Sequence, residues 1–340
     1  QKRAEHPCFG YPVESFEFER AAARWEKVRF GWEVDPEWVK YSNGVLPFLM
    51  YAIRAFAYPG DKVVIQPPVY PPFQAITKNN GCQLLTNPLI QDENGKYQID
   101  FEDLEEKLKD PRTKLFFMSN PHNPVMRAFT LEELTRIGEL CLKYHVIVIA
   151  DEIHCDLTYK GYHHIPFASI SEEFAQNSMV LINPSKTFNI AGFRTGAAII
   201  PNKKMRDNIQ IIIEDNKNYG RTIFGMLSFI TAYTECDYYA DEMMDYLENG
   251  NIRHSVNYPD CDMGLRGDKT RILVLHHNVP NMIGQISAVL AKDNMNIADL
   301  TNKSKGKYAY TMIDVDSEVP EGVVEELKRI GEVLRVRVIC

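Results

Sequence analysis

From about residue 44 to residue 200, segments with the periodicity of an amphipathic helix alternate with short runs that are apolar at almost every position. "PFLMYAIRAFA" and "TLEELTRIGELCLKYH" have helical spacing, whereas "DKVVIQ", "KLFFMSN", "VIVIADE" and "SMVLIN" have the pattern of strands. Strands that are apolar on both faces and separated by helices are typical of a mostly parallel sheet covered by helices. The pattern therefore predicts an α/β fold for this part of the chain.

Polar, turn-forming segments follow three of these predicted strands, namely "SNPHNP", "ADEIH" and "NPSK". In open α/β sheets, ligands bind at the carboxyl ends of the strands. We therefore expect a ligand site among these segments.

A different pattern begins after about residue 245. The segment "NGNIRHSVNYPDCDMGLRGDK" is rich in Asn, Gly, Pro and Asp and has no sustained periodicity, which predicts a linker over residues 246–267. Residues 268–340 then contain "TRILVLHH", "NMIGQISAVLAKDN", "NIADLTNK", "YAYTMIDVD", "EGVVEELKRIG" and "LRVRVI". These segments predict a small ferredoxin-like βαββαβ domain. The expected organisation is a large domain over residues 1–245, the linker and this small domain.

Composition narrows the possible functions. A chain of 340 residues is long enough for two domains. The net charge of −8 argues against nucleic acid as a partner, because phosphate binding needs a basic face. The apolar runs are too short for a membrane span. Seven scattered cysteines without a CxxC spacing indicate reduced thiols in a cytoplasmic protein, with neither a disulfide framework nor a metal site.

The segment "LINPSKTFNIAGFRTG" places Lys186 between an apolar strand and a glycine-containing turn, with Arg194 further on. A lysine amine becomes a nucleophile or base only when burial or a neighbouring cation lowers its pKa. Partial burial after the strand and the charge of Arg194 would supply both conditions. The alternative is an ordinary surface lysine in a loop.

Other polar residues near the predicted strand ends complete a possible cofactor site. Asp151 suits a fixed negative charge beside a protonated ring nitrogen, although such a carboxylate also caps helices. Asn123 is placed to bond a ring oxygen, or it belongs to a proline-rich turn. Tyr70 suits stacking on a ring, or core packing. The free N–H groups of residues 44–46, at the start of a predicted helix, suit a phosphate.

In this order, these motifs resemble pyridoxal-phosphate enzymes of the aspartate-aminotransferase fold, known as fold type I. The nearest resemblance is to the branch that holds cystathionine β-lyase and related carbon–sulfur lyases. It extends from the first residues to about residue 244, and "PSKTFNIAGF", "NPHNP" and "ADEIHCDL" are its most specific parts.

The resemblance implies a role for each residue of the constellation. Lys186 corresponds to the catalytic lysine that carries pyridoxal 5'-phosphate, and Asp151 to the partner of its ring nitrogen. Asn123 corresponds to the donor to the ring oxygen, Tyr70 to the stacking residue and Arg194 to a phosphate-binding arginine.

Further positions follow from the same resemblance. Tyr11 in "FGYP" corresponds to a tyrosine that reaches the phosphate of the neighbouring subunit, which implies a homodimer. Gly44, Val45 and Leu46 would contribute N–H groups to the phosphate. His154 would tune the site, or it is a hydrogen-bonded structural histidine.

The implied activity is that of a lyase or an aminotransferase acting on a small amino acid. Lys186 would remove the α-proton as general base. Loss of a β-thiolate would then give β-elimination, and reprotonation on the cofactor would give transamination. The resemblance also implies that the family's N-terminal segment and C-terminal small domain are missing from this chain.

Residues 246–340 instead resemble the C-terminal end of D-3-phosphoglycerate dehydrogenase, including its regulatory ACT domain. "HHNVPNMIGQISAVLAKDNMNIADL" and "KGKYAYTMIDVDSEVPEGVVEELKRI" are the specific parts. This resemblance implies an L-serine effector bound by His276, Asn278 and Asn296, whereas "HH" would otherwise be a half-exposed pair at a strand end. No GxGxxG fingerprint occurs, so the dehydrogenase machinery is missing.

Two functional hypotheses follow, beside a third in which the chain is a non-functional fusion whose halves each fold only partly. The first is a pyridoxal-phosphate enzyme of amino-acid metabolism fused to an amino-acid-sensing ACT domain. The second is a catalytically dead fragment of that fold, joined to a serine-binding regulatory domain.

Overall fold

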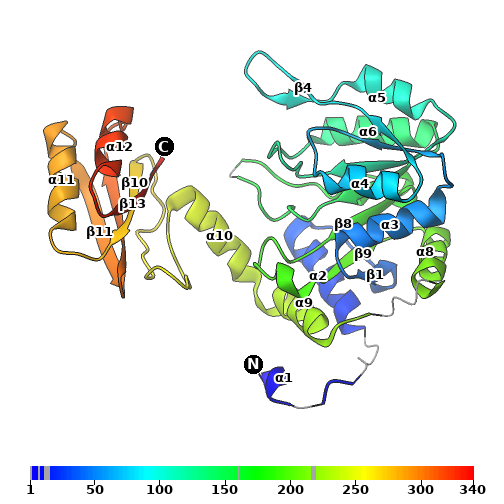
Figure 1. The fold of residues 1–340 in the computed structure, drawn as a ribbon, viewed down its shortest axis with the longest axis horizontal. Coiled ribbons are helices and arrows are strands. Elements are labelled where there is room, and N and C mark those ends of the chain that lie inside the picture. Colours follow the sequence, from blue (N-terminus) through cyan, green and yellow to red (C-terminus); the bar gives the residue numbers. More distant parts are fainter. Residues whose placement is uncertain (1, 7, 11–15, 160, 216–219) are drawn as a thin grey trace. The chain divides into compact units, whose positions relative to one another are not determined.

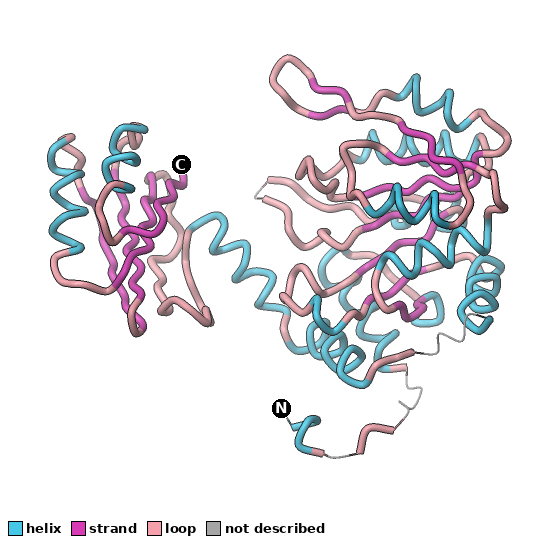
Figure 2. Tube along the Cα trace, in the orientation of Figure 1, coloured by secondary structure: helices cyan, strands magenta, loops and turns pink. Residues whose placement is uncertain are grey.

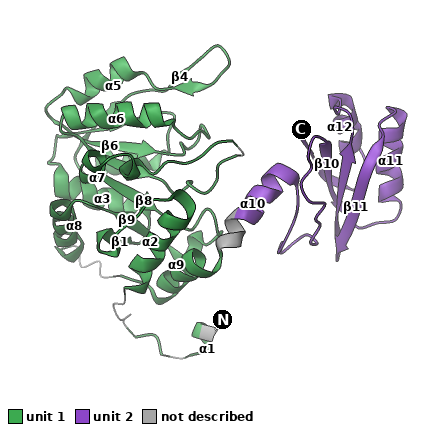
Figure 3. Ribbon diagram, turned by 180° about the vertical axis from the view of Figure 1, so that it is seen from behind, with its two compact units in different colours: residues 1–237 green, residues 238–340 purple. Residues whose placement is uncertain are grey.

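The computed structural model describes residues 2–6, 8–10, 16–159, 161–215 and 220–340. The chain divides into two compact units, residues 1–237 and residues 238–340 (Figure 3). Helix α10 (Asp237–Asn249) therefore belongs almost entirely to the second unit. This division falls several residues before the boundary expected from composition.

The first unit contains most of the secondary structure (Figure 1). Its strands are β1 (Val39–Ser42), β2 (Lys62–Ile65), β3 (Gln83–Thr86), β4 (Ile90–Gln91), β5 (Tyr97–Gln98), β6 (Thr113–Ser119), β7 (Ile147–Asp151), β8 (Ser178–Ile182) and β9 (Gly196–Ile199). Its helices are α1 (Lys2–Glu5), α2 (Glu17–Phe30), α3 (Val45–Phe56), α4 (Pro72–Asn79), α5 (Phe101–Leu108), α6 (Leu131–Lys143), α7 (Glu172–Gln176), α8 (Lys203–Asp215) and α9 (Ile223–Glu235). Short 3-10 turns are η1 (Pro36–Trp38), η2 (Phe167–Ser169) and η3 (Ala191–Phe193).

A seven-stranded sheet in the order β1-β9-β8-β7-β6-β2-β3 forms the centre of this unit (Figure 2). Strands β3, β2, β6, β7 and β8 are parallel, whereas β9 is antiparallel to both β8 and β1. The predicted, mostly parallel α/β sheet is confirmed.

The apolar strands are buried on both faces, as their sequence pattern predicts. On one face, Phe117 of β6 belongs to the same core as Phe48 of α3 and Ile209 of α8. Phe116 and Val148 alternate with residues of that core and are also fully buried. Because successive strand residues point to opposite faces, helices must cover both sides of the sheet.

Local signals explain where helix α6 begins. The hydroxyl of Thr130 accepts a hydrogen bond from the Glu133 N–H, and the Glu133 carboxylate accepts one from the Thr130 N–H. This capping box satisfies donors that the first helical turn leaves without partners. Helix α6 then packs against β7, the strand that ends at Asp151.

The second unit contains β10 (Thr270–His277), α11 (Met282–Lys292), β11 (Ile297–Lys305), β12 (Tyr308–Val315), α12 (Glu321–Lys328) and β13 (Val333–Ile339). The predicted element order βαββαβ is observed. The strands form an antiparallel sheet in the order β11-β12-β10-β13. Ile286 of α11 and Leu327 of α12 share a core with Ile272 and Val274 of β10.

The segment expected to be a linker is packed onto the sheet of the second unit. Ile252 and Cys261 form an isolated antiparallel bridge, and both are buried with Leu273 and Met312. Alternate residues of β10 lie in the helix-covered core, so this segment covers the opposite face. Part of residues 246–267 is therefore structural.

A buried ion pair joins the same segment to the sheet. Arg271 of β10 is fully buried and makes two hydrogen bonds to the Asp314 carboxylate, at 2.6 and 2.8 Å. Its remaining terminal nitrogen donates to the carbonyl oxygens of Asn249 and Gly264, each at 2.8 Å. The guanidinium thus holds both ends of the packed segment.

The structure also bears on membrane-spanning helices and on the state of the cysteines. In the part of the chain that is described, none of the helices has both the length and the apolar character that crossing a bilayer requires. All seven cysteines lie in described residues, and each is a free thiol.

Candidate functional site

The parallel strands bring several predicted site residues to one edge of the sheet. Ser119 pairs with Asp151, and Asp151 pairs with Leu181, so β6, β7 and β8 end nearly level. Asn123 lies in the loop just after β6, and Lys186 lies in the loop just after β8. The shared strand direction therefore brings together residues that are far apart in sequence.

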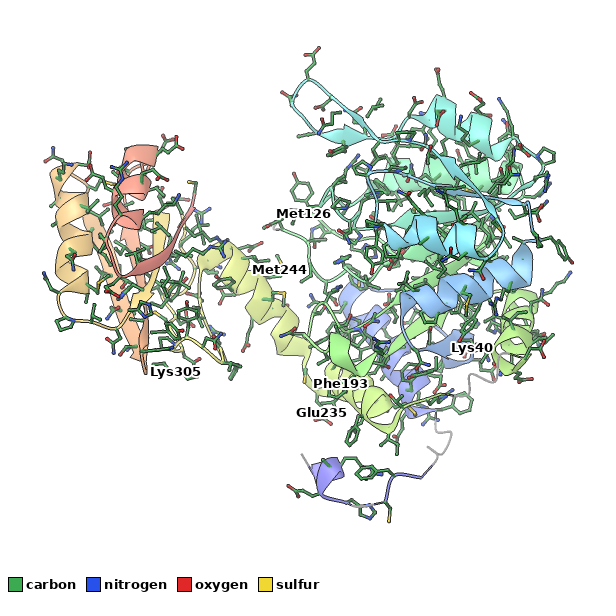
Figure 4. All side chains as sticks on the ribbon, viewed as in Figure 1. Lys40, Met126, Phe193, Glu235, Met244 and Lys305 are labelled. Carbon is green, nitrogen blue, oxygen red and sulfur yellow. The ribbon has the colours of Figure 1, made fainter. Side chains whose placement is uncertain are left out.

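Two further segments reach the same edge. Ser42, the last residue of β1, pairs with Gly196, the first residue of β9, and β9 runs antiparallel to β8. Gly44 follows β1 and Arg194 precedes β9, so both lie beside the ends of the parallel strands. Figure 4 labels Phe193, the neighbour of Arg194 in this edge loop.

The start of α3 is an open helix N-terminus. Gly44 is its N-cap, has φ +118° and ψ 177°, and no side chain caps the helix. The first N–H groups of a helix, including those of Val45 and Leu46, have no acceptor within it. A Cβ placed on Gly44 would meet no atom within 4 Å. Free donors, the positive helix end and open space fit a phosphate group.

Asp151 is a buried carboxyl without a hydrogen-bonding cation among the described residues. It is 3% exposed, and its Oδ1 accepts one long hydrogen bond, 3.4 Å, from the Ile153 N–H. Burial raises its pKa to about 7, the charge of Glu152 adds to this effect, and the charge of Lys186 opposes it. A protonated ring nitrogen would supply the missing positive partner.

Lys186 lies close enough to influence both Asp151 and His154 electrostatically. Its side chain is exposed, so the partial burial expected from the preceding strand is wrong. Burial, followed by the charge of Lys186, lowers the pKa of His154. The His154 Nδ1 is buried and has no hydrogen-bond partner in the described residues. The alternative interpretation of His154 as a hydrogen-bonded structural histidine is therefore not supported at Nδ1.

The remaining predicted residues occupy loops around the same edge. The Asn123 N–H donates to the Ser119 hydroxyl at 3.3 Å, and Met126, labelled in Figure 4, marks the exposed end of this loop. Tyr70, in the segment after β2, is half-buried and makes an edge contact with Phe73. Arg194 is exposed and has the left-handed φ of 47°. Tyr11 lies outside the residues that the structure describes.

The structure also shows polar contacts that sequence analysis did not find. The buried Thr187 hydroxyl donates to the Asp156 carboxylate at 2.8 Å. The buried Glu152 carboxylate lies 2.8 Å from His164 Nε2 and accepts from the Phe167 N–H. Glu152 and Asp156 both belong to the "ADEIHCDL" motif, so the sequence did single out this segment. It could not indicate their hydrogen-bond partners, because those partners are distant in sequence.

The three predicted effector residues do not come together within one chain. Both ring nitrogens of His276 are engaged, with the His277 carbonyl and with the Thr311 hydroxyl, and the residue is buried rather than half-exposed. Asn278, which directly follows the last residue of β10, donates a hydrogen bond to the Gly306 carbonyl. Asn296 bonds Asp316, beside the start of β10, at the opposite end of the sheet.

The arrangement in the first unit combines an anion-binding helix end, a buried acid and an accessible amine on one sheet edge. Among the described residues, no group of three or more His, Cys, Asp or Glu side chains is arranged to hold a metal ion. The helix end, the buried acid and the amine together fit an organic cofactor that carries a phosphate and a basic ring nitrogen.

Comparison with known proteins gives matches that centre on the first unit. The family described as aminotransferase class I and II matches residues 5–216. Cystathionine beta-lyase PatB from Bacillus subtilis (strain 168) is 43% identical over 248 residues, which is 73% of this chain and 64% of that protein. The chain thus spans less than two thirds of the length of this relative.

Solved structures match the fold as well. Cystalysin from Treponema denticola, which contains pyridoxal 5'-phosphate, matches with a TM-score of 0.70 and 33% identity over 73% of this chain and 62% of that one. A structure with bound pyridoxal phosphate from Clostridium difficile 630 matches with a TM-score of 0.71 and 30% identity. That alignment covers 96% of this chain and 84% of the other, so it extends into the second unit.

Proposed function

Because this chain belongs to the aminotransferase class I and II family, we propose that it binds pyridoxal 5'-phosphate and acts as a carbon–sulfur lyase on a small amino acid. The observation that carries this proposal is the meeting of buried Asp151 and accessible Lys186 at the sheet edge. The similarity to cystathionine beta-lyase PatB favours lyase chemistry. Transamination is the alternative within the family.

The proposal assigns a residue of this chain to each part of the cofactor. The N–H groups at the start of α3 and the guanidinium of Arg194 would hold the phosphate. Asp151 would accept a hydrogen bond from the ring nitrogen, which also compensates its burial. Tyr70 would lie against the ring, and Asn123 would donate to the ring oxygen.

The chemistry divides between cofactor and protein. Bound pyridoxal phosphate supplies an electron sink for negative charge at the α-carbon of an amino acid. Asp151 maintains a negative charge beside the ring nitrogen. The Nζ of Lys186, in its neutral form, removes the α-proton as general base. His154, whose pKa is lowered by burial, stays neutral nearby and adds no competing positive charge.

The test is the visible absorbance of the purified protein with added pyridoxal phosphate, before and after borohydride reduction, with mapping of the labelled peptide. We expect the cofactor to become fixed on Lys186. We also expect release of pyruvate from cystathionine, with a fall of about 100-fold or more in Lys186→Ala, because a general base contributes at least that much. Lys78→Ala, at an exposed position on α4, is the matched control.

The outcomes separate the hypotheses. Cofactor that borohydride still fixes covalently to the Lys186→Ala protein would overturn the assignment of the lysine. Cofactor binding without pyruvate release, but with amino-group transfer to a 2-oxo acid, would establish an aminotransferase. Cofactor binding without turnover of any amino acid would support the catalytically dead fragment.

We further propose that the second unit is an ACT domain that binds L-serine. The support is its βαββαβ order together with the sequence resemblance of residues 246–340. Asn278 and Asn296 lie at opposite ends of the sheet, so a site that uses both has to be shared between two copies. Light scattering should therefore show at least a dimer, and a monomer would contradict this proposal.

A cytoplasmic location is part of the same proposal. Buried Cys82, Cys141, Cys155 and Cys261 are free thiols, which suits a reducing compartment.

A further inference from the structure

The loop that carries Lys186 is attached to the protein body by a buried hydrogen bond. Thr187, the next residue, is 2% exposed and donates its hydroxyl to Oδ2 of Asp156, which is 5% exposed. Within the loop, the Phe188 N–H donates to the Pro184 carbonyl at 2.9 Å, and the Ile190 N–H donates to the Ser185 carbonyl at 3.2 Å. The Thr187 hydroxyl thus connects a locally hydrogen-bonded loop to a distant segment.

The surroundings of Asp156 are unfavourable for a carboxylate. Burial raises its pKa, which the Thr187 hydroxyl and Arg29 partly oppose. Arg29 Nε lies 3.4 Å from Asp156 Oδ1. The buried carboxyl of Glu26 is close enough to interact with Glu152 and Asp156, and neither of its oxygens has a hydrogen-bond partner among the described residues.

A cavity of about 290 Å³ adjoins this cluster and is lined by Arg29, Phe30, Cys155, Asp156, Thr158, His163 and His164. Asp156 therefore lies between the cavity and the Lys186 loop. Removing a carboxylate from water is costly, and buried charges are a poor source of stability. An arrangement with several buried carboxyls and few cations is typical of functional sites.

We propose that Asp156 is a positioning residue for Lys186, and that its carboxylate acts through the Thr187 hydroxyl. This inference rests on the proposed function. The contact holds the loop so that the Lys186 amine stays within electrostatic reach of Asp151 and His154. Asp156 touches neither substrate nor cofactor in this role.

The test removes the hydroxyl while keeping the side-chain shape. Thr187→Val deletes the donor, and Thr187→Ser restores a hydroxyl as the conservative rescue. Thr77→Val is the matched control, because Thr77 is also fully buried and donates its hydroxyl to a carbonyl, that of Phe73, at 2.8 Å. All three variants are made in the full chain.

Two measurements are compared across these variants. The first is hydrogen exchange of the Phe188 and Ile190 amides in the protein without cofactor. The second is the dissociation constant for pyridoxal phosphate, read from the absorbance that borohydride fixes on Lys186. A buried hydrogen bond to a charged group corresponds to about tenfold or more in equilibrium. We expect Thr187→Val to raise both the exchange rates and the dissociation constant about tenfold.

Thr187→Ser should remain close to the wild type in both measurements, and Thr77→Val should leave both unchanged even if it lowers overall stability. Unaltered exchange in Thr187→Val, or equal effects of Thr187→Val and Thr77→Val, would overturn the positioning role. If the wild type binds no cofactor, the proposed function is wrong. The proposal that Asp156 positions the Lys186 amine for catalysis is then wrong as well. The exchange data would then still decide whether the Thr187 contact holds the loop.

Discussion

Asp151 shows how one residue acquires its properties from its surroundings. An aspartate in water has a pKa near 4, whereas burial at the end of β7 raises the pKa of Asp151 to about 7. The single N–H donor from Ile153 compensates only part of this effect. Without a cationic partner, this carboxyl therefore destabilises the folded state once it is ionised.

We predict that Asp151→Asn removes a pH dependence of stability. Because the folded pKa is raised above the unfolded value, the folded protein holds a proton on this carboxyl that the unfolded chain loses between about pH 4 and pH 7. Relative to the variant, the free energy of unfolding of the wild type should fall across this window by up to about 4 kcal/mol. Above pH 7 the difference should be constant.

Urea unfolding of the protein without cofactor, in steps from pH 4.5 to pH 8, measures this effect. Asp215→Asn, at an exposed position on α8, controls for the loss of one negative charge. Parallel pH profiles for the wild type and Asp151→Asn would contradict the prediction.

At the scale of an element, the start of α3 depends on one backbone conformation. Gly44 has a combination of φ and ψ that residues with a Cβ rarely adopt. This conformation leads the chain from β1 into the helix, and the Ser42 hydroxyl supports the turn by donating to the Gly44 carbonyl at 2.6 Å. The open donors of α3 are a consequence of this glycine.

We predict that Gly44→Ala lowers the free energy of unfolding by about 1–3 kcal/mol through backbone strain alone. The new methyl group has free space, so no steric clash contributes. Chemical denaturation measures the loss. Gly192→Ala provides the control, since Gly192 also has open space but lacks a positive φ. Equal losses in the two variants would show that strain at residue 44 is not the cause.

The irregular segment between Asn249 and Gly264 depends on the contacts of Arg271. They connect β10 to the carbonyls of Asn249 and Gly264, two residues that flank an irregular segment. That segment has no periodic pattern, yet it covers one face of a sheet. Its structure is therefore held by the buried guanidinium and by apolar contacts rather than by local propensity.

For the whole molecule, each unit has its own apolar core, with Phe117 in the first and Ile286 in the second. We predict that calorimetry resolves separate transitions, and that pyridoxal phosphate raises only the transition of residues 1–237. At a ligand concentration 100 times the dissociation constant, the stabilisation should be about 2.7 kcal/mol. L-serine should raise only the other transition.

Residues 238–340 expressed alone identify which transition belongs to the second unit. A rise in the transition temperature of that fragment on adding pyridoxal phosphate would contradict the assignment of the cofactor to the first unit. If the fragment is dimeric and L-serine does not raise its transition temperature, the ACT proposal is contradicted.

The sequence patterns predict strands β2, β6, β7 and β8, helices α3 and α6, and the βαββαβ order of residues 268–340, and all of these are observed. Strands β1, β3 and β9 were not predicted. A strand buried on both faces is a continuous apolar run, so β6, β7 and β8 could be located from pattern alone. Because parallel strands end at a common edge, the sequence also predicts that Asn123, Asp151 and Lys186 lie near one another.

The partners of these residues and their degree of burial depend on the tertiary packing. Thr187 and Asp156 are separated by 31 positions, and His164 and Glu152 by 12, so no local periodicity relates them. The irregular segment after residue 249 gave no sign that it would cover a sheet. Burial and long-range hydrogen bonds depend on where whole elements pack, and that information is distributed over the entire chain rather than held in any one segment.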